Sequence, residues 1–313
     1  MLTSPRTGRQ HALAVLQALF VTFLWSTSWV LIKIGLDDLD LAPISFAGLR
    51  YALAALVLLP FGIRAVRARA DAQRPPDARL FAAVAAYGLL FVAIAQGAQF
   101  AALSVLPATA VTLVLSSTPV WVALIALTAG SERASAMQAA GIGLLLVGAV
   151  VYFGPFEVPP DAALGFLAAG VCVAAAATSA HVGRRLARDA TLRLGGPVGL
   201  TASSMAVGGA LLLIVGVLLE GWPSLDLGAW LIVVWLAVVN TAFAFTLWNH
   251  TLRTLTAVES SVVNNTMTIQ IAVLAVVFLG EALGASQLLG LLLAAVGAAV
   301  VQVAPILRGR RRG

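Results

Sequence analysis

Long apolar runs alternate with short polar segments along the whole chain. Each run is close to or above the roughly 20 residues that a helix needs to cross a bilayer. Helices are favoured over barrel strands because the runs are continuously apolar and a helix satisfies its own backbone hydrogen bonds in lipid. The pattern therefore predicts an all-α integral membrane protein with ten spans, at residues 12–34, 42–63, 80–102, 107–129, 136–154, 163–183, 197–219, 227–248, 256–279 and 285–306.

Composition supports this interpretation and excludes other classes. Apolar residues make up 61% of the chain and charged residues only 10%, and no polar segment is long enough for a separate soluble domain. The net charge of +6 does not indicate nucleic-acid binding, because the basic residues lie in short clusters between apolar runs. Cys172 is the single cysteine, so no intrachain disulfide is possible. The first run, residues 12–32, is too long for a signal peptide, and we expect it to be the first span.

The charges predict how the spans are oriented. If the N-terminus is cytoplasmic and the spans alternate, every Lys and Arg except Lys33 and Arg50 falls in a cytoplasmic segment. The opposite loops carry acidic residues, namely Asp37, Asp38, Asp40, Glu157, Asp161, Glu220, Asp226 and Glu281. The positive-inside rule then predicts ten spans with both termini in the cytoplasm. We expect the membrane to be an inner (plasma) membrane of bacterial type.

An internal repeat divides the chain into residues 1–155 and 156–313. Residues near the last span of each half recur at a constant offset of 149 positions: Glu132, Gln138, Gly141, Leu144 and Gly148 match Glu281, Gln287, Gly290, Leu293 and Gly297. Each half has five spans, an odd number, so the halves must cross the membrane in opposite directions. Inverted repeats of this kind are typical of secondary transporters. We expect the paired glycines to allow close helix packing, or to serve a dimer interface.

The first span carries the residues Leu24-Trp25-Ser26-Thr27-Ser28-Trp29, and each half closes with a Glu-led turn, a Gln and two glycines seven apart. With the five-plus-five layout, the chain resembles the EamA family of the drug/metabolite transporter superfamily. The Leu-Trp-Ser-Thr start and Trp248-Asn249 look more narrowly like amino-acid exporters of the YddG type. The resemblance implies a central cavity lined mainly by spans 1, 3, 4, 6, 8 and 9, with spans 5 and 10 outside it.

Polar and aromatic side chains at membrane depth are costly unless they face a cavity or a partner helix. The candidates for substrate binding on this argument are Trp25, Ser28, Gln96, Gln99, Ser116, Trp121, Asn240, Trp248 and Asn264. The alternative roles are contacts with lipid for the tryptophans and hydrogen bonds between helices for the amides and hydroxyls. Aromatic walls would contact an apolar side chain, and amides would bind a zwitterionic end.

Three further positions have specific expectations. Pro119 removes a backbone donor in the fourth span and is a candidate hinge, or a static kink. His181 and Glu259 are a possible proton-coupling pair, although an interfacial histidine and a helix-terminal carboxylate are the favoured roles. Arg50 is expected to reach outward to Asp37, Asp38 or Asp40, rather than to bind a substrate carboxylate.

The sequence contains no phosphate-binding loop, no His-Glu-x-x-His pair, no serine nucleophile motif and no Cys or His cluster for a metal. We therefore expect no cofactor and no enzymatic activity. The favoured function is export of small metabolites, most of all large neutral or aromatic amino acids, by alternating access. A multidrug exporter is the alternative, and the lack of an acidic residue within the first span counts against permanently cationic substrates. A membrane enzyme or channel is a remote alternative, and the sequence leaves open whether the chain is a monomer or a homodimer.

Overall fold

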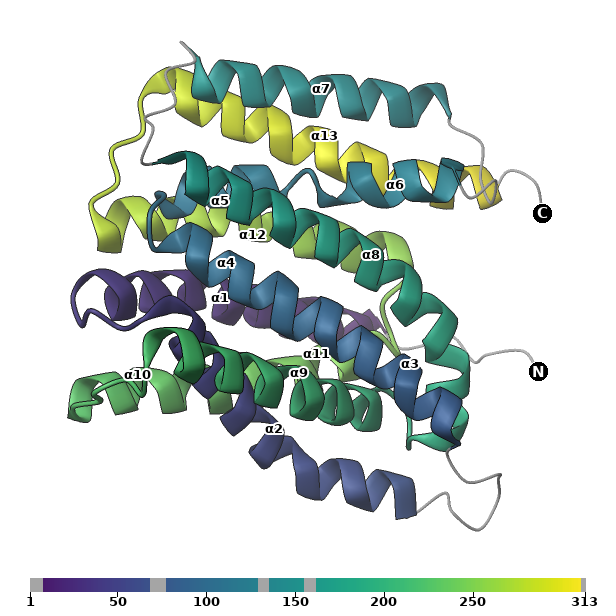
Figure 1. Cartoon of the computed structure of the whole chain (residues 1–313). Helices are drawn as coiled ribbons and strands as arrows, with labels where there is room; N and C mark the ends of the chain where they lie inside the picture. Colours follow the sequence, from purple (N-terminus) through teal and green to yellow (C-terminus); the bar gives the residue numbers. More distant parts are fainter. Residues whose placement is uncertain (1–7, 68–76, 129–134, 155–161, 311–313) are drawn as a thin grey trace.

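The computed structural model describes residues 8–67, 77–128, 135–154 and 162–310. Within these residues, ten helical segments are long and apolar enough to cross a membrane, one for each predicted span (Figure 1). Seven are single helices: α1 (Gly8–Asp37), α2 (Pro43–Arg67), α7 (Ala136–Phe153), α8 (Ala163–Arg193), α9 (Pro197–Glu220), α12 (Ala257–Leu279) and α13 (Ala285–Arg310). The described residues contain no β-strand.

Three spans are divided. The third consists of α3 (Ala78–Gly88), the π-helix η1 (Leu89–Ile94) and α4 (Ala95–Leu103). The fourth is broken into α5 (Ala108–Leu115) and α6 (Thr118–Thr128). The eighth consists of α10 (Leu227–Ala237), the π-helix η3 (Val238–Phe243) and α11 (Ala244–Thr251).

The two ends of the bundle differ in charge. At the acidic end, helix termini and turns carry Asp37, Asp38, Asp40, Glu220, Asp226 and Glu281; at the arginine end, they carry Arg9, Arg64, Arg67, Arg79, Arg193 and Arg253. Helix α1 begins and α13 ends at the arginine end (Figure 1). That this end faces the cytoplasm remains a prediction from charge.

The glycines of α7 and α13 make contacts related by an approximate two-fold axis. A Cβ on Gly148 would lie 2.6 Å from the carbonyl oxygen of Gly290, and a Cβ on Gly290 would lie 2.6 Å from that of Gly148. Gly141 and Gly297 approach each other in the same reciprocal way. Because the repeat offset exchanges these two pairs, the contacts have the symmetry of an inverted repeat. The glycines therefore serve packing within the chain.

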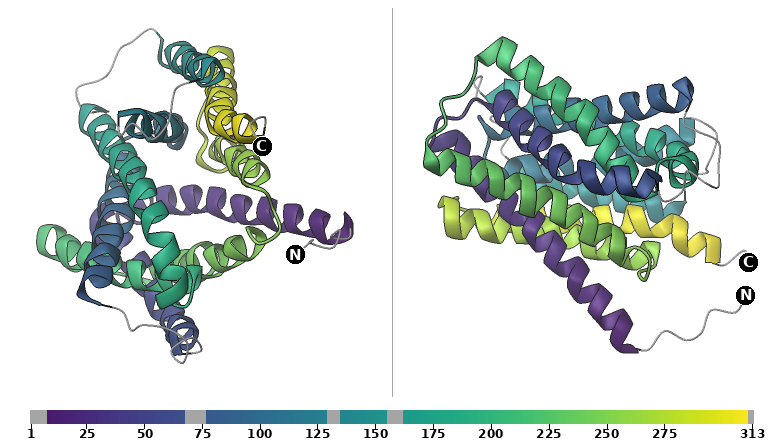
Figure 2. Two further views of the ribbon diagram at one scale, coloured as in Figure 1. Left: turned by 90° about the vertical axis from the view of Figure 1, so that its right-hand side faces the viewer. Right: turned by 90° about the horizontal axis from the view of Figure 1, so that it is seen from below.

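The π-helices follow the same symmetry. Segment η3 begins at Val238, 149 positions after η1 begins at Leu89, so both halves insert the wider turn at the equivalent place. A second helix pair, α2 and α9, packs closely through Gly48, Gly209 and Gly216. In Figure 1 the α7–α13 pair lies at one edge of the molecule, and α2 packs with α9 toward the opposite edge. The remaining spans lie between them, and α1 crosses the bundle obliquely (Figure 2).

The repeated glutamates and glutamines have local structural roles. Gln138 and Gln287 each accept a hydrogen bond from a backbone N–H three residues earlier, at Ser135 and Gly284, and so cap α7 and α13. Glu281 caps a different helix: it accepts hydrogen bonds from Ala108 N, Thr109 N and Thr109 Oγ1 at the start of α5. Its repeat partner Glu132 lies outside the described residues. The Glu281 carboxylate therefore joins the second half of the chain to the first.

Ionic contacts at the arginine end join other helices. Glu259 lies 3.1 Å from His11, which links α12 to α1, and Arg193 lies 3.2 Å from Asp77, which links α8 to α3. The Leu80 N–H and the Arg193 guanidinium donate to Asp77, and these hydrogen bonds lower the pKa of that carboxyl. Asp77 therefore stays ionised as the N-cap of α3.

Candidate substrate cavity

A cavity of about 660 Å³ lies between the two halves. Its walls come from α1, the third span, the broken fourth span, α8 and α12, with residues of α7 and α13 at the arginine end. Toward the acidic end it is lined by Trp29, Gln99 and Thr112, and near the middle of α12 by Ile271. Toward the arginine end its lining includes Gln138, Ser261, Asn264, Asn265 and Gln302.

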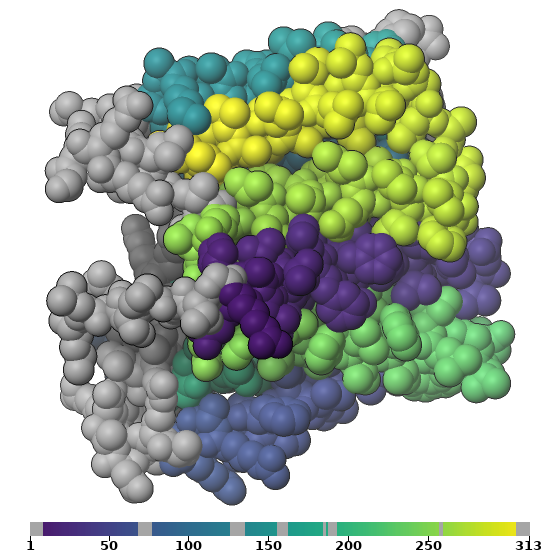
Figure 3. Space-filling model, turned by 180° about the vertical axis from the view of Figure 1, so that it is seen from behind, coloured from purple at the N-terminus to yellow at the C-terminus, as the bar shows by residue number. Residues whose placement is uncertain are grey.

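The cavity extends toward the arginine end, where the fourth span and α12 diverge. Helix α12 packs against α5 near the acidic end, where Glu281 also joins the two. Further along, the cavity separates Pro119 and Val122 of α6 from Ser261 and Asn264 of α12. Figure 3 shows the molecule from behind, where α13, α12 and α1 lie side by side.

The break in the fourth span lies in the cavity wall. Pro119 has no N–H for the carbonyl of Leu115, and the hydroxyl of Thr118 donates to that carbonyl instead, at 2.7 Å. Ser116 and Ser117 donate in the same way to the carbonyls of Leu113 and Val114. Irregular backbone at membrane depth is tolerated where its polar groups are satisfied or line a cavity. The side-chain hydroxyls therefore stabilise the break in this span as part of the cavity wall.

Five predicted residues line the cavity: Gln96, Gln99, Ser116, Asn264 and the hinge candidate Pro119. Gln96 is held by a hydrogen bond of 2.6 Å that the hydroxyl of Tyr51 donates to its Oε1. Asn264 is exposed to the cavity, whereas the adjacent Asn265 bonds Ser261 of its own helix and Gln302 of α13. Both asparagines line the cavity, but only Asn265 makes a hydrogen bond to a neighbouring helix in the described part of the chain.

Five other predicted residues lie outside this cavity, contrary to expectation. Ser28 donates to the carbonyl of Trp25 in its own helix. Asn240 is fully buried and donates to Thr27 and to the carbonyl of Leu24, so it joins the eighth span to α1. Trp121 is 50% exposed on the outer face of α6, since Pro119 and Val122 occupy the inner face.

Trp25 and Trp248 belong to a row of aromatic rings beside the cavity. Tyr87 stacks on Phe91, Phe91 contacts Phe245, and Phe245 and Trp248 both contact Trp25, with ring centroids 5.1 to 6.4 Å apart. Only Phe91 of this row lines the cavity. The row fills the space between the third span, the eighth span and α1. This explains why the eighth span contributes no lining residue, although the family resemblance implied that it would.

The possible coupling pair is not formed. Glu259 faces His11 and also caps its own helix with Thr256, as the favoured alternative expected. His181 Nδ1 donates to the carbonyl of Ala177 in the preceding turn of α8, at 3.1 Å. Glu259 therefore contacts α1, whereas His181 bonds its own helix.

Arg50 points inward, which corrects the expectation that it reaches the outer loop. It is 4% exposed, and its Nε donates to Thr241 in η3 at 3.0 Å. Its guanidinium lies over the ring of Tyr51, at 5.1 Å from the centroid. The helix buries this position against the eighth span, so the side chain does not extend to Asp37, Asp38 or Asp40.

Some lining residues were not among the predicted site residues. Thr112 is the most informative, because its hydroxyl is buried in the cavity wall and no group among the described residues hydrogen-bonds it. Gln138 and Gln302 come from spans that the family resemblance placed outside the cavity. A buried threonine on an apolar helix carries no distinct sequence signal, and only the packing shows which way it faces.

Replacing Pro119 by alanine is expected to lower transport severalfold without loss of folded protein. Alanine supplies the N–H that Leu115 lacks, which favours a continuous helix across the present break. The measurement is initial transport rate per folded protein in liposomes. Pro60→Ala is the matched control, because Pro60 also lies inside a span but is exposed on α2 and does not line the cavity. Equal rates for both variants would show that the break is a static kink.

Two halves of opposite orientation that enclose a cavity beside a broken helix define a membrane transporter of the inverted-repeat class. The sequence matches the EamA-like transporter family over residues 12–154 and again over residues 163–303. The chain belongs to this family, within the drug/metabolite transporter superfamily.

Comparison with solved structures supports the fold. A crystal structure of a protein that is 23% identical in sequence superposes with a TM-score of 0.64, covering 96% of this chain and 99% of the other. At this identity the likeness concerns the fold alone. No curated protein matches the chain.

Proposed function

We propose that the chain exports small zwitterionic metabolites, with amino acids of large neutral or aromatic side chains as the favoured substrates. The observation that carries this proposal is the chemistry of the cavity. Its described lining residues are amides, hydroxyls, apolar side chains and aromatic rings, and none of them is charged. A zwitterion has no net charge to neutralise and can be bound by amide and hydroxyl dipoles alone. A permanent cation would lack a counter-ion there, which disfavours the multidrug alternative.

The lining offers a division of roles. Gln99 and Thr112 lie toward the acidic end and would bind the charged groups of the substrate. Trp29 and Phe91 would contact its side chain, with Met267 on the opposite wall. Binding between two related halves suits alternating access, in which the halves rock about the site.

Purified protein in liposomes tests the proposal. We expect uptake of radiolabelled phenylalanine or leucine into liposomes above that of protein-free liposomes, with and without an imposed pH gradient. Stimulation by the gradient would indicate proton coupling, and no stimulation would indicate facilitated diffusion. Movement of a cationic dye without movement of any amino acid in a broad panel would overturn the proposal in favour of the multidrug alternative.

Gln99→Leu is expected to raise the KM for the transported amino acid about tenfold, with little change in maximal rate. A hydrogen bond to a charged group contributes roughly 1.5–3 kcal/mol, and its loss from binding appears in KM. Concentration dependence of uptake in liposomes measures the effect. Gln10→Leu is the control, because Gln10 is an exposed glutamine of α1 outside the cavity. An unchanged KM for Gln99→Leu would remove this residue from the binding site.

A further inference from the structure

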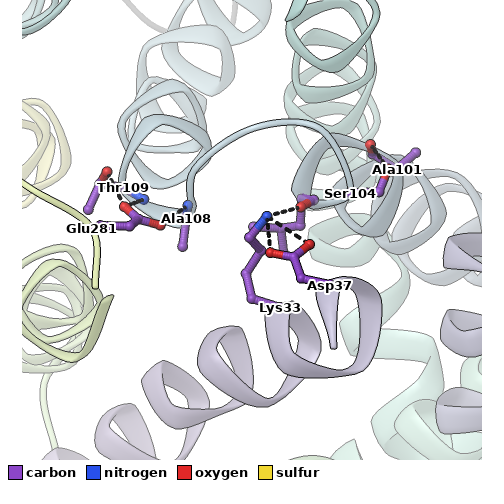
Figure 4. Close-up of polar contacts among 8 residues, drawn as sticks. Lys33, Asp37, Ala101, Ser104, Ala108, Thr109 and Glu281 are labelled. Atoms are coloured by element: carbon purple, nitrogen blue, oxygen red, sulfur yellow. Dashed lines mark hydrogen bonds and ion pairs between the residues drawn. The ribbon is translucent and has the colours of Figure 1, made fainter. Parts of the chain in front are cut away.

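A second hollow, of about 450 Å³, lies at the acidic end of the bundle. We call it the vestibule. It is bounded by the last turns of α1, the turn at residues 104–107 and the end of α12 (Figure 4). Its charged lining residues are Lys33, Asp37, Asp38 and Glu281. In contrast to the uncharged cavity, the vestibule therefore carries charges of both signs.

The vestibule and the cavity lie along the same helices. On α1, Lys33 of the vestibule follows Trp29 of the cavity by one turn, on the same face. On α12, Phe278 of the vestibule follows Ile271 of the cavity by two turns. Between these positions the packing is apolar and closed, as at Ala275, which has no exposed surface. The two hollows thus follow one another along α1 and α12, with closed packing between them.

Lys33 occupies the inner part of the vestibule. It is the only lysine in the chain, and its side chain is 12% exposed, against 47% for Asp37. Its Nζ lies 2.9 Å from an Asp37 oxygen and donates to the carbonyl of Leu103 at 3.0 Å. The lysine is therefore the more buried partner of this ion pair, and Asp37 is the more exposed one.

The acidic residues of the vestibule differ in availability. Both oxygens of Glu281 already accept hydrogen bonds from the first residues of α5. Asp37 bonds Lys33 alone among the described residues, and Asp38 is exposed beside it. The groups that can exchange partners without uncapping a helix are therefore Lys33 and Asp37.

We propose that Lys33 is the carboxylate-binding residue of an outer substrate site, with Asp37 as the partner of the substrate ammonium. This inference rests on the proposed export of zwitterions. When a zwitterion binds, the Lys33–Asp37 ion pair is replaced by two others: Lys33 pairs with the substrate carboxylate, and Asp37 pairs with the substrate ammonium. No charge is then left unpaired. A ligand with one charge satisfies one of the two groups and leaves the other without a partner. The site thus selects for substrates that carry both charges.

The depth of the two groups fixes the orientation of the ligand. The carboxylate enters first toward Lys33, and the ammonium stays near the rim. A free amino acid should therefore compete from the acidic side, its methyl ester should not, and its N-acetyl derivative should retain weak competition. In the Asp37→Asn variant, Lys33 loses its ionic partner, and the N-acetyl derivative should compete at least as well as the free amino acid.

Membrane vesicles of both orientations test the proposal. We expect Lys33→Gln to raise the half-saturating phenylalanine concentration about tenfold on the acidic side and to leave it unchanged on the arginine side. Lys33→Arg should restore most of the acidic-side affinity, because it keeps the charge. Asp40→Asn is the matched control: Asp40 lies in the same turn outside the vestibule, and its backbone φ of 49° suits asparagine.

The outcomes separate this inference from the proposed function. If the wild type transports amino acids and Lys33→Gln has the same half-saturating concentrations as the wild type, Lys33 does not bind substrate. If Lys33→Gln raises the half-saturating concentration equally on both sides, Lys33 does not act on the acidic side alone. Either result overturns the proposed role of Lys33. Absence of amino-acid transport by the wild type overturns the proposed function, and this inference with it.

Discussion

Replacing Gly148 by leucine is expected to prevent the two halves of the chain from assembling. Any side chain at this position begins 2.5 Å from the backbone nitrogen of Ala294 and 2.6 Å from the carbonyl oxygen of Gly290. Both obstacles are backbone atoms of α13, so rotation of a side chain cannot relieve the overlap. The helices must separate, which removes close packing along the whole pair. Overpacking a rigid core costs about 1–3 kcal/mol, and a contact between backbones costs more.

The measurement is the yield of monodisperse protein after solubilisation, together with its thermal unfolding temperature. Gly143→Leu is the matched control, because Gly143 lies on the same helix and is exposed, and a Cβ added there would meet no neighbouring atom within 4 Å. We expect Gly148→Leu to give little or no folded protein and Gly143→Leu to resemble the wild type. Equal stability of the two variants would mean that α7 and α13 do not pack through this glycine.

The fold was largely predictable from the sequence because its signals are long and cumulative. Each span contributes about 20 apolar positions, and the helix ends depend on local caps such as Ser135 with Gln138. The repeat offset, read from a few residues, holds for the reciprocal glycine contacts and for the start of both π-helices. Neither π-helix was itself predicted, since a wider helical turn has no clear residue signature.

The candidate site was less predictable, because it depends on how each helix is rotated about its axis. Gln96 and Gln99 face the cavity, whereas Trp121 faces outward although it is only two residues from Pro119. Apolar spans have weak amphipathic patterns, so the sequence does not show which polar face is inward. Asn240 and Ser28 illustrate the result: each is polar and buried, yet each bonds a helix backbone. Whether the lining residues bind substrate stays a prediction.

Replacing Glu281 by glutamine is expected to shift the protein toward a state that is open at the acidic end. The carboxylate joins the end of α12 to the start of α5, which are the two helices that diverge around the cavity at the arginine end. It accepts three hydrogen bonds, two of them at 2.6 Å. An amide has a single acceptor oxygen and no charge, so the tie is weakened. A loss of roughly 1.5–3 kcal/mol changes the ratio of open to closed states by about tenfold or more.

A cysteine in the cavity measures the shift. Cys172 is the only cysteine, so Cys172→Ser removes every thiol from the chain. Ala176→Cys then introduces a single cysteine in the cavity wall. With Glu281 intact, we expect an impermeant maleimide to label this cysteine from the arginine side alone. In the Glu281→Gln variant, labelling from the acidic side should increase at least severalfold. Labelling confined to the arginine side in both proteins would show that Glu281 stabilises a helix without controlling access.

Glu220→Gln provides the control that separates capping from access. Glu220 makes the equivalent set of bonds, from Ile44 N, Ser45 N and Ser45 Oγ at the start of α2. The helices that it joins, α9 and α2, pack closely and contribute no residue to the cavity. We therefore expect Glu220→Gln to lower the unfolding temperature as much as Glu281→Gln does, while labelling of the cavity cysteine stays on the arginine side. The carboxylate of Glu220 would then only cap α2, whereas the carboxylate of Glu281, with the same hydrogen bonds, would also keep the transport path closed at the acidic end.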